Sequence, residues 1–305
     1  MRDLAAIWGQ TGPATLLNRS ENEIWAAGDL VIRLHREGYH SRAEIASELD
    51  WLMALQATGL RCVTPRRAVS GELIVEVGAR LAVAFTRIDG HHPQAGDDLA
   101  AWLPEIGQIA ARLHDHAKAW ARPKGFIRKV WDAPAMIGAG AIWGDWRAAI
   151  GLDEAGRELL EATAADLAAR LASYRGGFGL IHGDLRLGNL LVTPQGLAVL
   201  DFDDCGMGWL MSDFAATVSF IETDPRLPDY ARLWVEGYRA LRPLGAEDLA
   251  ILPVMVMMRR IQLTAWLTSR AGNDTWAEFG GPQFARETVG LARDYLGGAG
   301  WWGAR

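Results

Sequence analysis

Three oxygen-bearing side chains lie close together around one short stretch of this sequence. Asp184 ends the segment His182-Gly183-Asp184, Asn189 follows it at a spacing of five residues, and Asp201 begins Asp201-Phe202-Asp203. Magnesium prefers hard oxygen ligands, with phosphate and water completing its octahedron. Asp201 and Asn189 meet that need, which leaves Asp184 to accept or orient the proton of an attacking hydroxyl. Phosphoryl transfer requires little more than such metal ligands and one group that positions the nucleophile.

Two short apolar runs position these side chains. Leu190–Val192 and Leu197–Leu200 flank the turn Thr193-Pro194-Gln195-Gly196, and this pattern predicts an antiparallel hairpin. Pairing brings the start of the first strand beside the end of the second. We therefore expect Asn189 to lie near Asp201, with Asp184 in the loop just before the hairpin.

The first 88 residues predict a small antiparallel β-sheet with one helix. Ser41 and Glu44 have the spacing of a capping box, so the helix begins there and ends near Gly59. Gly28-Asp29 indicates a hairpin turn between two of the strands. The expected strands cover residues 14–17, 24–27, 30–35, 68–75 and 81–88.

After residue 89 the periodicity becomes mainly helical. Helices are expected over 99–120 and 153–174, and several more follow Asp213, whereas 122–151 predicts a loop with short helical turns. The predicted fold class is thus α+β with two lobes. A nucleotide-binding lobe covers residues 1–88, and a catalytic and acceptor-binding lobe covers residues 89–305.

Composition excludes several classes of protein. The formal net charge is −6, so the basic surface of a nucleic-acid-binding protein is not expected. The apolar stretch 249–258 is near ten residues, short of the roughly 20 that span a bilayer. Two cysteines, Cys62 and Cys205, indicate no disulfide framework. A cytoplasmic protein with no membrane or nucleic-acid partner fits these features.

The spacing from Asp184 to Asn189 equals that of the protein-kinase catalytic loop, and Asp201-Phe202-Asp203 takes the place of its metal-binding motif. With these motifs the chain resembles the superfamily of aminoglycoside phosphotransferases, choline kinases and type II homoserine kinases. The nearer likeness is to the branch that contains the bacterial stress response kinase. It rests on Asp201–Gly208, Gly125–Ile127 with Trp131-Asp132, and the stretch from Arg259-Arg260 to Leu267.

The resemblance implies ATP and Mg²⁺ as cofactors and assigns roles by position. Asp184 would be the catalytic base, Asn189 and Asp201 the magnesium ligands, and Asp213 a buried carboxylate behind the catalytic loop. The loop Asn18–Ile24 would cover the phosphates, and the hinge Phe85–Ile88 would face adenine. The implied nucleotide-binding residues are Arg33, Glu48, Asn22, Thr86 and Ile88.

Two departures from the family pattern concern the nucleotide. Arg33 stands where the family usually has a lysine, and a guanidinium fork grips phosphate with a geometry unlike that of an ammonium. The loop Asn18–Ile24 also lacks a G-x-G-x-x-G pattern. Nucleotide contact is expected to be retained with Arg33, whereas the loop allows weaker or differently shaped phosphate contact.

Several residues have more than one interpretation. Asp203 and Asp204 are either further metal or substrate contacts or solvated turn carboxylates. Arg186 contacts a phosphate, an acidic substrate or solvent. His182 is interpreted as a brace of the loop. The pair His114 and His116 lies on different helix faces, so a structural role is favoured over a metal site.

Three functions remain open from the sequence. The first is a kinase that transfers the γ-phosphate of ATP to a hydroxyl of a small molecule, an amino alcohol or a hydroxy amino acid. The second has the same chemistry with protein Ser/Thr as the acceptor. The third is a nucleotide-binding pseudokinase that regulates a partner, supported only by Arg33 and the atypical loop. Neither the acceptor nor the oligomeric state follows from the sequence.

Overall fold

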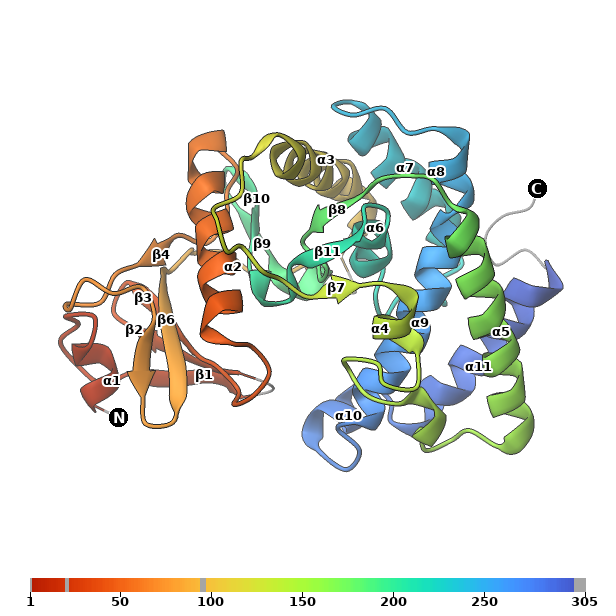
Figure 1. Cartoon of the computed structure of the whole chain (residues 1–305), viewed down its shortest axis with the longest axis horizontal. Coiled ribbons are helices and arrows are strands. Elements are labelled where there is room, and N and C mark those ends of the chain that lie inside the picture. Colours follow the sequence, from red (N-terminus) through yellow and green to blue (C-terminus); the bar gives the residue numbers. More distant parts are fainter. Residues whose placement is uncertain (1, 20–21, 94–96, 299–305) are drawn as a thin grey trace. The chain divides into compact units, whose positions relative to one another are not determined.

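The computed structural model describes residues 2–19, 22–93 and 97–298, which form two compact units (Figure 1). The first unit comprises residues 1–93, 119–129 and 188–205, and the second comprises residues 94–118, 130–187 and 206–305. The predicted division at residue 88 differs from these units in two later segments, 119–129 and 188–205. Both segments are held in the first unit by hydrogen bonds. Val199 of residues 188–205 bonds to Arg61 and Val63, and Arg128 of residues 119–129 bonds to Glu44.

The first unit is built on an antiparallel sheet in the order β1-β2-β3-β6-β4, with β5 paired to β6. The two-residue turn Gly28-Asp29 joins β2 to β3 as predicted, and Gly28 adopts a left-handed backbone, with φ 58°. The strands are β1 (Thr15–Arg19), β2 (Glu23–Ala27), β3 (Leu30–Leu34), β4 (Pro65–Arg66), β5 (Val75–Val77) and β6 (Arg80–Thr86).

The helix α2 (Arg42–Leu55) begins where the capping box predicts. Ser41 Oγ accepts the Glu44 N–H at 3.2 Å, and Glu44 Oε2 accepts the Ser41 N–H at 2.8 Å. A short 3-10 turn, Gln56–Thr58, follows α2, and Gly59 ends it in the left-handed conformation. This start and this end confirm the predicted helix. A further short helix, α1 (Arg2–Ala6), precedes the sheet.

The prediction of one strand over residues 68–75 is wrong. Ala68 accepts the Gly71 N–H at 2.9 Å and donates its own N–H to Glu72 O at 2.8 Å, so these residues form a turn. Gly71, with φ 90°, permits this reversal. Two short strands, β4 and β5, lie on either side of the turn in place of one longer strand.

The predicted hairpin forms and belongs to the first unit. Strands β9 (Leu190–Thr193) and β10 (Gly196–Val199) pair antiparallel, with Leu190 opposite Val199. Val199 also bonds to the segment before β4, because it accepts the Val63 N–H at 3.2 Å and donates to Arg61 O at 2.8 Å. These bonds hold residues 188–205 on the first unit.

The second unit is mainly helical, as predicted. It also has a three-stranded sheet that the sequence did not predict, because β11 is half glycine and β7 is only two residues long. This sheet has the order β7-β11-β8, from β7 (Val130–Trp131), β8 (Phe178–Ile181) and β11 (Gly206–Trp209). The helices are α3 (Leu103–Ala119), α4 (Ala133–Ile137), α5 (Glu154–Ser173), α6 (Ser212–Thr217), α7 (Leu227–Arg239), α8 (Ala246–Ala250), α9 (Leu252–Thr268), α10 (Asp274–Glu278) and α11 (Pro282–Gly297).

Helix α9 is the centre of the second unit, where α4, α5, α6 and α11 pack around it. Together, α8 and α9 form a segment, Ala246–Thr268, that is 23 residues long and apolar enough by length and composition to cross a membrane. The apolar segment is therefore longer than the stretch of near ten residues that the sequence predicts. However, 78% of its apolar window is buried inside the protein, which is the environment of a core helix.

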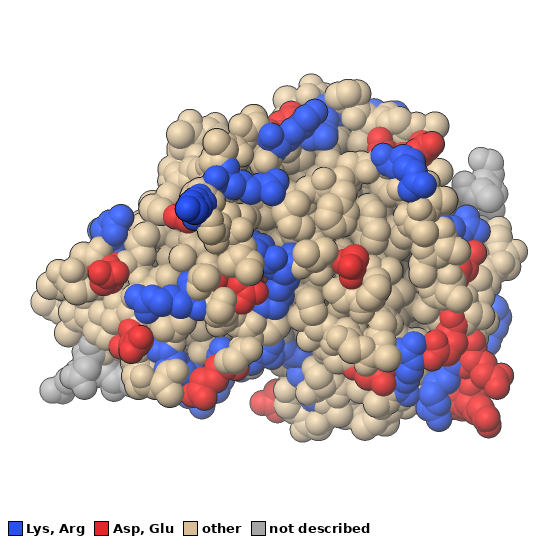
Figure 2. Space-filling model, viewed as in Figure 1, with Lys and Arg blue, Asp and Glu red and all other residues tan. Residues whose placement is uncertain are grey.

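Charged side chains show no separation by sign on the face in view in Figure 2, where basic and acidic residues are interspersed. This distribution agrees with the small net charge of −6. A single-sign stripe of the kind that follows a nucleic-acid backbone is not seen on that face among the described residues.

Candidate active site

The predicted catalytic loop follows β8 in the second unit, and a buried carboxylate holds it. Asp213, on α6, is 0% exposed and accepts two backbone hydrogen bonds from the loop. The His182 N–H donates to it at 3.1 Å and the Gly183 N–H at 2.8 Å. Gly183 adopts a left-handed backbone with φ 80°, which suits glycine. The expectation that Asp213 lies behind the loop is confirmed.

His114 orients Asp213 from the neighbouring helix α3. Its Nε2 lies 3.1 Å from the Asp213 carboxylate, and its Nδ1 lies 2.9 Å from Tyr238 Oη. Burial raises the pKa of Asp213, but the hydrogen bond and charge of His114 outweigh burial and leave that pKa below its usual value. Both ring nitrogens of His114 therefore contact buried side chains of the second unit, which is the structural role favoured for this residue.

Asp184 is in contact with two arginines of the second unit. Arg186 Nε lies 3.2 Å from its Oδ2, and Arg259 Nη2 donates to its Oδ1. Burial raises the pKa of Asp184, but the charges of Arg259 and then Arg186 hold it below its usual value. The His182 ring braces the loop, because its Nδ1 accepts the Asp184 N–H at 3.3 Å. Asp184 is therefore an ionised carboxylate in a fixed loop.

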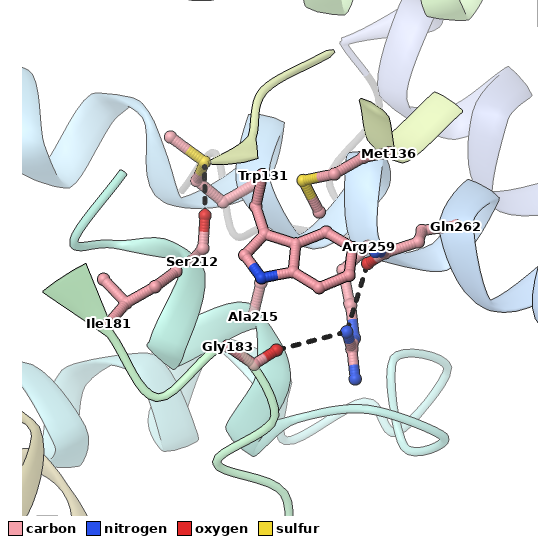
Figure 3. Close-up of a pocket in the computed structure, with 9 residues that line it drawn as sticks. Trp131, Met136, Ile181, Gly183, Ser212, Ala215, Arg259 and Gln262 are labelled. Carbon is pink, nitrogen blue, oxygen red and sulfur yellow. Dashed lines mark hydrogen bonds between the residues drawn. The ribbon is translucent and has the colours of Figure 1, made fainter. Parts of the chain in front are cut away.

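A small cavity of about 10 Å³ adjoins this loop (Figure 3). That volume holds roughly one water molecule. Arg259 borders it and donates to Gly183 O at 3.4 Å and to Gln262 Oε1 at 3.1 Å. The cavity is lined by Trp131, Met136, Ile181, Gly183, Ser212, Ala215, Met255, Arg259 and Gln262.

The predicted metal ligands lie together at one end of the hairpin in the first unit. The Leu200 N–H donates to Asn189 O at 2.8 Å, which brings Asn189 beside the residue before Asp201. Asp201 has a left-handed backbone with φ 55°, a conformation that aspartate tolerates. Its carboxylate is 46% exposed. The hairpin thus places an amide and an accessible carboxylate close in the fold, as expected, whereas Asp184 belongs to the other unit.

Arg33 links the predicted nucleotide residue Glu48 to Asp201. Its Nη2 lies 2.7 and 2.6 Å from the two oxygens of Glu48, and its Nη1 lies 3.2 Å from Asp201 Oδ1. Arg33 and Glu48, both implied nucleotide-binding residues, are thus paired with each other. The guanidinium fork serves two carboxylates at once, which a point ammonium does less well.

Asp203 is a site residue that the sequence left undecided. It is 7% exposed, so the interpretation as a solvated turn carboxylate is wrong. Its Oδ2 accepts Asn22 Nδ2 at 2.9 Å, and its Oδ1 lies 3.5 Å from both His35 Nδ1 and His40 Nε2. Burial raises the pKa of Asp203, but the charge of Arg33 and the nearby rings of His40 and His35 hold it well below its usual value.

The other predicted nucleotide residues lie at the ends of strands β2 and β6. Asn22 lies just before β2, where its Oδ1 accepts the Arg36 N–H at 2.9 Å, while Ser20 and Glu21 of the expected phosphate loop lie outside the described residues. Thr86 ends β6 and donates its N–H to Thr64 O at 2.9 Å. Ile88 follows half-buried. Contact of Thr86 and Ile88 with adenine stays a prediction.

Two basic residues that the sequence analysis missed lie around the Asp201–Asp204 segment in the first unit: Arg128 binds the segment directly, and Lys129 binds His40, which faces Asp203. Arg128 is 6% exposed and donates to the backbone carbonyls of Cys205 at 2.6 Å, Glu44 at 2.8 Å and Asp203. Lys129 Nζ lies 2.8 Å from His40 Nδ1. Their position directly after Gly125–Ile127, a segment typical of the family, was the available signal.

The fold and these sites together define a kinase-like phosphotransferase. Residues 17–244 match the phosphotransferase enzyme family, so the chain belongs to that family. Its fold is the α+β, protein-kinase-like fold that the sequence predicted, with an antiparallel sheet in the N-terminal part and a mainly helical C-terminal part.

Known proteins of this family are similar over most of the chain. The structure of a microcompartment-associated aminopropanol kinase has 37% identity and a TM-score of 0.89, and the match covers 98% of each chain. Amicoumacin kinase hAmiN, solved with AMP-PNP, Ca²⁺ and amicoumacin, has 19% identity and a TM-score of 0.78, over 94% of this chain and 92% of its own. A homoserine kinase of Gluconobacter oxydans is 25% identical, over 75% of this chain and 71% of its own.

Proposed function

We propose that this kinase transfers the γ-phosphate of ATP to the hydroxyl of a small amino alcohol or hydroxy amino acid, with Mg²⁺ as cofactor. The observation that carries the proposal is the ionised Asp184 in a loop that Asp213 fixes from behind. A carboxylate that stays ionised can accept the proton of an acceptor hydroxyl, or orient that hydroxyl for attack on the phosphate.

The first unit supplies groups that suit a metal–nucleotide complex. Asp201 and Asn189 would hold Mg²⁺, because they offer an exposed carboxylate and an amide oxygen at the same hairpin end. The metal would neutralise phosphate charge when bound. Arg33 would contact the phosphates, since it lies between Glu48 and Asp201. Asn22, Thr86 and Ile88 would bind the rest of the nucleotide.

The acceptor class is supported by two of the similar proteins. Aminopropanol is an amino alcohol and homoserine is a hydroxy amino acid, and kinases named for these acceptors match most of the chain. The AMP-PNP and Ca²⁺ in amicoumacin kinase likewise support a nucleotide with a divalent cation. We also propose a cytoplasmic location, in accord with the two buried free thiols Cys62 and Cys205.

The alternatives have narrower support. The nearer likeness to the stress response kinase branch, and with it a protein Ser/Thr acceptor, rests on the short motifs alone. The pseudokinase alternative rested on Arg33 and the phosphate loop. Arg33 keeps both the Glu48 pairing and a contact with Asp201, which supports an active enzyme.

The decisive experiment is a magnesium-dependent ADP-release screen with matched acceptors. Ethanolamine, 1-aminopropan-2-ol, serine, threonine, homoserine and a generic protein acceptor would be compared at saturating ATP. We expect turnover with a small acceptor, and an Asp184→Asn enzyme at least about 100-fold slower, since general-base groups contribute that much or more. Asp115→Asn, on the exposed side of α3, is the control. Equal turnover by Asp184→Asn, or turnover only with the protein, would contradict the proposal.

A further inference from the structure

Arg259 has more contacts around the catalytic loop than a packing role requires. It lies on α9, is 3% exposed, and uses four of the five N–H donors of a guanidinium. Nε donates to Ser219 Oγ at 3.2 Å, Nη1 to Gly183 O and Gln262 Oε1, and Nη2 to Asp184 Oδ1. Its guanidinium carbon also lies 4.7 Å from the centre of the Trp143 ring. These contacts fix its position.

The local sequence explains how α9 delivers this side chain. Arg259 and Gln262 are three residues apart on the helix, so they share one face, and Figure 3 shows both at the edge of the cavity beside Gly183. Ser219 follows α6, the helix that also carries Asp213. The same elements therefore hold the backbone of the catalytic loop and the arginine that contacts Asp184.

The two arginines on Asp184 differ in their exposure. Arg186 lies on the loop itself, and its side chain is 34% exposed, whereas that of Arg259 is 3% exposed. Exposed charges are screened by water and salt, and buried ones much less. Arg259 thus holds Oδ1 from the protein interior, while the more accessible Arg186 contacts Oδ2.

We propose that Arg259 is a positioning residue for phosphoryl transfer: it binds Oδ1 of Asp184 and so holds this carboxylate in the position that receives the acceptor hydroxyl. This inference rests on the proposed function, because it takes Asp184 as the group that orients the acceptor. Arg259 touches neither the acceptor nor the nucleotide in this account. Its effect passes through the charge and orientation of one carboxylate.

The groups that face Asp184 determine the pH dependence. These groups include Arg259 from α9 and Arg186 and His182 from its own loop, while Asp213 contacts the loop backbone from α6. Because Arg259 lowers the pKa of Asp184, its loss moves that pKa upward. The carboxylate is then protonated at a higher pH, and the acid limb of kcat/KM shifts to higher pH.

The test is the pH profile of kcat/KM for Arg259→Gln and Arg259→Lys. Arg259→Gln is expected to shift the acid limb up by roughly 1 pH unit, the usual effect of one nearby opposite charge, and to lower kcat by about 10-fold or more. Arg259→Lys keeps the positive charge, so the pH of its acid limb should lie close to that of the wild-type enzyme. The KM for ATP is expected to change less than about twofold.

Two comparisons separate this role from others. Arg260→Lys is the matched control: Arg260 is the adjacent buried arginine, but it contacts Glu222 and Thr288, so its acid limb should match the wild type. Threonine and 1-aminopropan-2-ol differ by one carboxylate. Equal losses of kcat/KM by Arg259→Gln with both acceptors support the positioning role. A loss of kcat/KM with threonine alone means that Arg259 binds the acceptor carboxylate, and this result overturns the proposal.

Folding and activity controls keep the outcomes distinct. Thermal unfolding and ATP affinity are measured for each variant. Ser219→Ala removes the partner of Arg259 Nε and a 3.4 Å hydrogen bond from Ser219 Oγ to Ala215 O, and it provides a milder variant with a smaller shift in the same direction. An unshifted acid limb in a folded, active Arg259→Gln enzyme overturns the role of Arg259 alone. A wild-type enzyme without transfer to any acceptor overturns the proposed function and this inference with it.

Discussion

At the scale of single residues, buried charge organises both units. Arg33 in the first unit and Arg259 in the second are each 3% exposed and bind carboxylates directly. A buried charge is tolerated only with partners, so each arginine fixes the carboxylates around it. The contact of Arg33 with Asp201 and that of Arg259 with Asp184 are not encoded locally, because these partners lie 168 and 75 residues apart in the sequence.

Asp203 provides a test of this principle in the first unit. Replacing it by asparagine removes a carboxylate that faces Arg33, His35 and His40 and that accepts from Asn22. We expect a loss of about 3 kcal/mol in the free energy of unfolding, the usual cost of breaking a buried ion pair, and a higher KM for ATP.

Urea unfolding and ATP titration measure the two effects of the Asp203 substitution. Asp204→Asn is the matched control, because its neighbouring carboxylate is half-buried and contacts Tyr39 Oη, which an amide oxygen can replace. A destabilisation by Asp203→Asn no larger than that of the control would show that the buried cluster does not stabilise the fold.

At the scale of secondary-structure elements, α2 carries Glu48, a proposed nucleotide-binding residue, and depends on its cap. Ser41→Ala removes the hydrogen bond to Glu44 N, so we expect a loss of about 1 kcal/mol in stability. Glu44→Gln retains an oxygen for the Ser41 N–H and should cost less. Chemical unfolding of both variants checks this order, and the reverse order would mean that the charge of Glu44, paired with Lys129 at 3.4 Å, matters more than the cap.

The elements also show what the sequence could and could not predict. The capping box at Ser41, the hairpin turn at Gly28 and the hairpin after Asn189 were readable because each depends on residues close in sequence. Strand β11 was missed, since its pairing with β7 and β8 joins segments far apart in the chain. Arg128 and Arg259 were unassigned for the same reason: local periodicity does not report which distant carbonyl or carboxylate a buried arginine reaches.

At the scale of the whole molecule, the predicted active-site residues belong to two units. Asp184 and its supporting residues lie in the second, while Arg33, Glu48, Asn189 and Asp201 lie in the first. Each group is held by contacts within its own unit. The joint action of the two groups in catalysis is part of the proposed function. The kinetics of Asp184→Asn test the group in the second unit, and ATP titration tests the group in the first unit separately.

The stability of the whole chain should fall in two steps on acidification, and the first step depends on His35. Burial, and then the charge of Arg33, lowers the pKa of His35 to about 3, well below its ordinary value near 6.5. The fold therefore favours the neutral ring. Its stabilisation is complete above about pH 6.5 and is lost as the pH falls toward 3.

Between pH 6.5 and 4.5 this loss should amount to about 2 kcal/mol, since one pKa unit corresponds to roughly 1.4 kcal/mol. The second step comes below about pH 4, because Asp203 and Asp213 have lowered pKa values in the fold. The stabilisation from these two carboxylates is present above the ordinary aspartate pKa near 3.9 and is lost below it.

Urea unfolding at pH 7.5, 6.5, 5.5 and 4.5 measures the first step. In His35→Gln the free energy of unfolding should stay nearly constant between pH 6.5 and 4.5, because glutamine has no proton to gain. The fall in this free energy below about pH 4 should remain. A wild-type free energy of unfolding that stays constant from pH 7.5 to 4.5 would mean that His35 is not held neutral by the fold.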